Sequence, residues 1–160
     1  MTIKTGAVAG RRVLKFENLD DLQREAERVA SLPGKTLGNW STAQIVDHLA
    51  KSIRATYDGP EVTGPWFVRM IVWPIIKSRM LAKGMPAGFS VPKKMAHFLP
   101  DNNPILEASL RDLRTWLGRL KTEAPRLGHP LFGKLSHRDW IRLHLRHGEL
   151  HLSFVAPEAM

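Results

Sequence analysis

Three histidines near the end of the chain are the residues whose type and spacing could do chemistry. They lie in the stretch SHRDWIRLHLRHGELHLSF, where Ser136 is a typical N-cap for a helix over 136–154. A step of 100° per residue places five side chains of this helix within a stripe roughly 80° wide. These are Trp140, His144, His147, His151 and Phe154. Since an amphipathic helix turns such a stripe toward the core, imidazoles in it require a specific partner.

His147 and His151 lie one helical turn apart, so both rings can bind one ion from the same side. Neutral imidazole is a common ligand of Zn, Cu, Fe and Ni. Because two ligands hold a metal poorly, the pair predicts a third ligand elsewhere. The alternative is a pair of core-edge histidines bonded to backbone or water. Glu149 faces the other side of the helix, so the H-E-x-x-H arrangement of zinc proteases, with its glutamate base, is absent.

His48 is the candidate for the third ligand. It lies in a predicted helix over 41–57 that begins with Ser41 as N-cap and Gln44 as its capping-box partner. His48 falls at the edge of the apolar face of that helix, which consists of Ile45, Leu49, Ile53 and Thr56. Small neighbours on the same side leave room for a cavity beside the ring. Taken alone, this residue would better suit a half-buried histidine bonded to a neighbour than a metal ligand.

Five helices must position these rings, and together they predict an all-α protein. Apolar periodicity, caps and breakers place them over 18–32, 41–57, 65–83, 104–122 and 136–154. The helix over 65–83 is the most apolar, but charged residues interrupt it and Pro74 should kink it, so we expect no transmembrane segment. The connection over 84–102 is long and rich in Gly and Pro, and we expect it to cover one end of the bundle near the histidines.

Composition limits the class of protein. The 160 residues suit a single domain over 1–160, and the chain has no cysteine, which excludes disulfides and thiolate ligands. The N-terminus lacks the apolar core of a signal peptide, so we expect a cytoplasmic protein. The net charge is +9, which would suit nucleic acid, an anionic membrane or an acidic small molecule. Because the charges are spread along the chain, we do not expect nucleic-acid binding.

Four short motifs resemble the DinB/YfiT-like superfamily of metal-binding bundles, and more closely an uncharacterised bacterial branch of it. They are W-S-x-x-Q-x-x-x-H-L over 40–49, G-x-P-A-G-F over 84–89, H-P-x-F-G-x-L-S-x-x-x-W over 129–140 and H-x-x-x-H-L over 147–152. The resemblance covers a core of about 11–155. It implies an up-down-down-up four-helix bundle with a long crossover and a short N-terminal extension.

The resemblance also implies a site. It places one divalent metal, with Zn and Ni as the expected ions, on His48, His147 and His151. His144 is then the candidate for a spare ligand or a catalytic proton carrier. The chain departs from many members at two places, where Leu150 and Ser153-Phe154 stand instead of a second His and a Gln.

Relatives in the superfamily include transferases and isomerases that use low-molecular-weight thiols. The resemblance therefore implies a metal-dependent enzyme with thiol-dependent transferase or hydrolase-type chemistry on an unknown small-molecule ligand. A non-catalytic metal-binding or stress-related protein is the first alternative, and a basic nucleic-acid-binding bundle is the second. A homodimer is compatible with all three functions.

Overall fold

Helices make up most of the structure, as the sequence predicts. The computed structural model describes residues 3–32, 34–59, 73–88, 98–129 and 132–157. Its helices are α1 (Leu19–Ser31), α2 (Thr42–Asp58), α4 (Trp73–Lys83), α5 (Leu106–Thr122) and α6 (His137–Leu152). A 3₁₀ turn, η1 (Thr5–Ala7), precedes them. The described helix boundaries α1, α2, α5 and α6 fall within two residues of the predicted ones.

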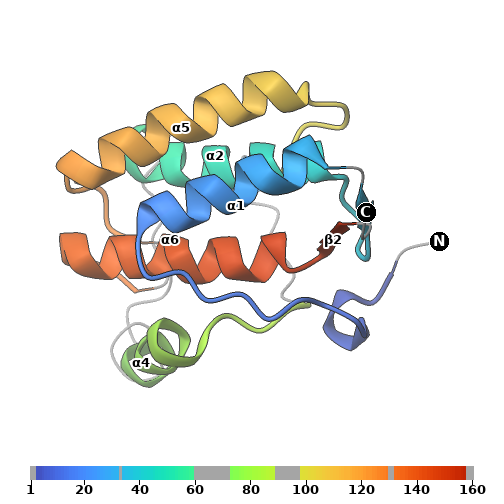
Figure 1. The fold of residues 1–160 in the computed structure, drawn as a ribbon. Helices are drawn as coiled ribbons and strands as arrows, with labels where there is room; N and C mark the ends of the chain where they lie inside the picture. Colours follow the sequence, from blue (N-terminus) through green and yellow to red (C-terminus); the bar gives the residue numbers. More distant parts are fainter. Residues whose placement is uncertain (1–2, 33, 60–72, 89–97, 130–131, 158–160) are drawn as a thin grey trace.

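The four long helices lie side by side, with α4 beside α6 on the side away from α5 (Figure 1). The colour gradient shows α1 and α6 running in one direction and α2 and α5 in the other. At one end of the bundle, Tyr57 Oη donates a hydrogen bond of 2.6 Å to the carbonyl of Glu123, which joins the ends of α2 and α5. Because α2 shares its direction with α5 and not with α6, α2 runs antiparallel to α6.

Local side-chain caps explain where the helices begin. Asn18 and Asp21 form a capping box at α1, and Ser41 and Gln44 form the predicted one at α2. At α6, Ser136 Oγ accepts a hydrogen bond from the backbone N–H of Asp139. The first part of the predicted helix over 65–83 lies outside the described residues, and α4 is described from Trp73 onward.

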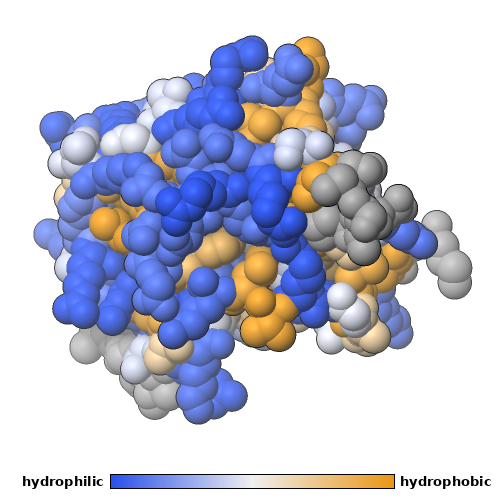
Figure 2. Space-filling view, viewed as in Figure 1, coloured by the Kyte–Doolittle hydropathy of each residue, from blue (hydrophilic) through white to orange (hydrophobic). Residues whose placement is uncertain are grey.

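The core lies between the four long helices. The apolar face predicted for α2 is buried, and so are three apolar residues on one face of α1 and three leucines of α5. The buried residues of these faces are Leu22, Ala26, Val29, Ile45, Leu49, Ile53, Leu113, Leu117 and Leu120. Charged residues occupy the outer sides, and hydrophilic side chains cover most of the face shown in Figure 2. No helix in the described ranges has both the length and the apolar character that crossing a bilayer requires.

A two-stranded sheet that the sequence did not predict ties the ends of α1 and α6 together. β1 (Gly34–Thr36) pairs antiparallel with β2 (Val155–Pro157), with Lys35 opposite Ala156. The backbone N–H of Leu37 adds a hydrogen bond of 2.9 Å to the carbonyl of Phe154. This pairing fixes the end of the helix that carries the histidine pair.

The segment before α1 packs against the side of α6 that faces away from the histidine stripe. The Phe16 side chain is buried, and its backbone N–H donates a hydrogen bond of 2.6 Å to Glu149 Oε1. The same carboxylate pairs with Arg146. This segment therefore covers the part of α6 that lies opposite the histidine stripe.

Two glycines in long helices differ in their surroundings. A Cβ at Gly148 in α6 would lie 2.4 Å from Leu22 Cδ1 and 3.0 Å from its Cγ. Leu22 is fully buried, so it has little room to move. A Cβ at Gly118 in α5 would meet nothing within 4 Å. Gly148 therefore lets α1 approach α6 closely, whereas Gly118 has no such role.

We expect opposite effects when each glycine is replaced by alanine. Gly148→Ala should lower the free energy of unfolding by about 1–3 kcal/mol, because overpacking outweighs the gain in helix propensity. The control, Gly118→Ala, should raise it by up to about 1 kcal/mol. Urea unfolding of both EDTA-treated variants measures the difference. Equal stabilisation by both substitutions would contradict the close packing of α1 on α6.

Candidate metal centre

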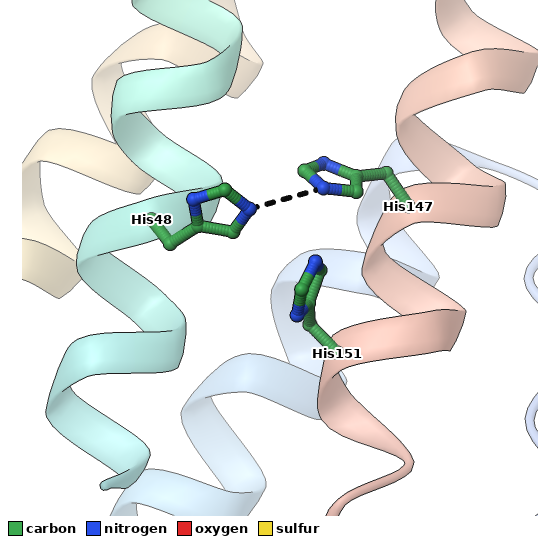
Figure 3. A group of neighbouring side chains, drawn as sticks. All are labelled: His48, His147 and His151. Atoms are coloured by element: carbon green, nitrogen blue, oxygen red, sulfur yellow. Dashed lines mark hydrogen bonds between the residues drawn. The ribbon is translucent and has the colours of Figure 1, made fainter. Parts of the chain in front are cut away.

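Three imidazoles meet between α2 and α6. His48 extends from α2 toward His147 and His151 on α6 (Figure 3). The Nε2 atoms of His48 and His147 are 3.1 Å apart, and ring nitrogens of all three residues lie within 4.8 Å of one another. The three ring centroids are 4.6–4.9 Å apart in pairs. The structure thus brings together the three histidines predicted as ligands, and we call them the three-His group.

The carbonyl of Phe98 determines which nitrogen of His48 is available. It lies 2.5 Å from His48 Nδ1. A carbonyl only accepts hydrogen bonds, so Nδ1 carries the proton and Nε2 keeps its lone pair. A backbone carbonyl behind a ring is the usual partner of a metal-ligating histidine. Sequence reasoning missed Phe98, because it acts through its backbone and carries no side-chain signal.

Trp40, the residue before the N-cap of α2, packs its ring against the three-His group. Its ring stacks on His151 at a centroid distance of 5.3 Å and an angle of 20°. It also lies 4.8 Å from the His48 ring. The spacing of the W-S-x-x-Q-x-x-x-H stretch therefore has a physical basis, since it joins a ring contact, a helix cap and a candidate ligand within ten residues.

Polar side chains of α2 hold the end of the 84–102 connection beside His48. Asp47 Oδ2 accepts a hydrogen bond of 2.8 Å from the backbone N–H of Asp101. Gln44 Nε2 donates to the carbonyls of Asp101 and Asn102, and Lys51 pairs with both aspartates. The described ends of the connection, 84–88 and 98–102, lie near the site. Residues 89–97 lie outside the described residues, so the prediction that the connection covers one end of the bundle stays a prediction.

The rings of the three-His group are neutral at physiological pH. Burial lowers the pKa of His48 to about 4, against a smaller opposing effect of the Phe98 carbonyl and Asp47. Burial also lowers the pKa of His147 and of His151 well below the usual value, and the neighbouring rings act in the same direction. Neutral imidazole is the form that binds a metal.

His144 lies outside the three-His group. Its ring stacks on Trp140 at a centroid distance of 5.8 Å and an angle of 15°. Burial lowers its pKa to about 3. Within the described ranges, His144 Nε2 and Trp140 Nε1 are buried without a hydrogen-bond partner. Buried polar atoms of this kind are uncommon and require a specific explanation.

The three-His group opens onto a cavity of about 1010 Å³. Side chains of α2, α4 and α6 line it, together with both described ends of the 84–102 connection. His144, Trp140 and His129 lie in the same wall. The volume is at the upper end of the range for sites that bind small molecules.

The donor set fits a divalent transition metal. Tetrahedral coordination with Zn–N bonds of 2.0–2.1 Å separates two nitrogens by about 3.3 Å, close to the 3.1 Å between His48 and His147. The donors are all nitrogen, which suits Zn or Ni better than Mg or Ca. Metal ions with such preferences could be held here by the three-His group.

Comparison with known proteins gives a family without an assigned activity. The sequence profile of the family described as "Protein of unknown function (DUF1569)" matches residues 8–158. No curated protein and no solved structure shows significant similarity to the chain. The match spans nearly the whole sequence and includes all three histidines of the group. The chain therefore belongs to the DUF1569 family.

Proposed function

We propose that the protein is a metal-dependent enzyme of the DinB-like superfamily, with His48, His147 and His151 as ligands of one Zn or Ni ion. The directions of the four long helices support the superfamily assignment, since they match those that the sequence motifs imply. The ring separation, the neutral state of the three rings and the carbonyl behind His48 support the metal assignment.

One observation carries the proposal of catalysis: the three-His group is part of the wall of a large cavity. Structural zinc sites are closed by four protein ligands, whereas catalytic sites use three and leave a position for water or substrate. Within the described ranges, no fourth His, Asp or Glu joins the group. The vacant position would face the cavity, where a small molecule has room to bind.

A metal held here would lower the pKa of a bound water or thiol and so supply a nucleophile near neutral pH. The chain has no cysteine, so any thiolate at this site would belong to a low-molecular-weight thiol or a substrate. Such chemistry suits a transferase or a hydrolase.

The residues around the group would orient and shield it. Trp40 covers His151, and the Phe98 carbonyl holds the His48 ring in one tautomer. His144 stays neutral at pH 7 because its pKa is about 3, so it suits hydrogen bonding to a bound ligand better than proton transfer.

Metal content of protein purified without an affinity tag tests the ligand assignment. Wild-type protein should contain one metal ion per chain, and His147→Ala should retain less than about a tenth of it, because two imidazoles from different helices chelate poorly. His137→Ala is the matched control, since His137 lies in the same helix but bonds to the Leu120 carbonyl. Metal content that is unchanged in His147→Ala, or lost equally in both variants, would contradict the assignment.

The lowered pKa values predict that metal binding releases few protons at pH 6. Three imidazoles with the ordinary pKa of about 6.5 would together release about 2.3 protons. Because the folded pKa of His48 is about 4 and those of its neighbours are also well below normal, we expect fewer than about 0.5. Calorimetric titration of EDTA-treated protein with Zn in two buffers of different ionisation enthalpy measures this number. A release near two protons would show that the rings are not buried as neutral bases.

A further inference from the structure

The wall of the cavity beside the three-His group is mostly apolar and carries two positive charges. Most of the wall is apolar and includes Trp40, Ile76, Met80, Phe132, Leu143 and Leu150. Among the described residues that line it, none is acidic, and the only two with a permanent charge are Arg79 and Lys83 on α4. Both are exposed, which places them at the mouth of the cavity.

Among the described residues, Arg79 and Lys83 have no anionic partner. They lie one turn apart on α4, and the described residues offer neither of them an ion pair. Lys77 on the same helix is paired, at 2.8 Å, with Asp139 of α6. Two like charges at this spacing repel each other, so an anion held between them would relieve the repulsion.

We propose that the cavity binds a small organic anion with an apolar body, whose charged group lies between Arg79 and Lys83. This inference rests on the proposed function and gives the substrate class of the same site. The apolar wall takes the body of the ligand, and the cations hold its carboxylate, or another group of the same charge, at the mouth. The three-His group, which lines the same cavity, is then left for the reacting part of the molecule.

Octanoate and 1-octanol test the proposal, because they share an eight-carbon chain and differ in charge. Calorimetric titration of the Zn-loaded protein at low ionic strength should show octanoate binding about tenfold more tightly than octanol. In the double variant Arg79→Gln/Lys83→Gln, octanoate should bind about tenfold more weakly and octanol should be unaffected.

Two controls separate this ligand site from net charge and from the metal. Arg111→Gln/Lys35→Gln also lowers the net charge from +9 to +7, but these exposed residues do not line the cavity, so octanoate affinity should be unchanged. His147→Ala removes a proposed metal ligand and should still bind octanoate, since the cations are intact. Failure of metal binding in the wild type would thus be seen separately from failure of anion binding.

Any of the following four results overturns the inference. Octanoate fails to bind or binds no more tightly than octanol; the Arg79→Gln/Lys83→Gln variant binds it as the wild type does; or the affinity falls equally in the charge control. Loss of octanoate binding in His147→Ala alone would also overturn it, because the carboxylate would then be held at the metal.

Discussion

The antiparallel packing of α2 against α6 brings three imidazoles together, with His48 buried and His147 and His151 half-buried in the wall of the cavity. Burial of polar rings is unfavourable unless each finds a partner. His48 satisfies one nitrogen with the Phe98 carbonyl and the other with His147. The same burial keeps the rings neutral, which is the state required of a metal ligand. The site and its electrostatics thus follow from one helix–helix contact.

Several parts of the chain serve to hold that contact. Gly148, next to His147, allows α1 to lie close against the back of α6. The β1–β2 pair fixes the end of α6, and the segment around Phe16 covers the same side. On α2, Asp47 and Gln44 bind the backbone near Asp101, which keeps Phe98 beside His48. The neighbours of both helices therefore limit how far the rings can move apart.

The basic residues of the chain differ in whether they form ion pairs with acidic residues. Many of the described lysines and arginines pair with acidic residues at the surface, where such pairs contribute little to stability. Arg79 and Lys83 differ, since neither has an ion pair with a described residue and the described wall of the apolar cavity beside them has no acidic group. At this position, two of the positive charges are therefore available to bind an anionic ligand, whereas elsewhere the net charge serves solubility.

The sequence by itself determined the helices and the ligand pair. Asn18, Ser41 and Ser136 act within three or four residues of themselves, so the starts of α1, α2 and α6 could be predicted from contiguous stretches. The pairing of His147 with His151 follows in the same way from the pitch of one helix. His48 could be proposed as the third ligand only through its place at the edge of an apolar face and through a resemblance.

Only the tertiary structure decided the contacts between distant segments. His48 and His147 are separated by 99 residues, and their 3.1 Å contact depends on how two helices pack. The Phe98 carbonyl left no sequence signal, because every residue has a carbonyl. Glu149 is polar and lies opposite the histidines, yet the segment before α1 buries it. Periodicity gives the side of a helix on which a residue lies, whereas the partner that covers that side depends on the packing of the whole chain.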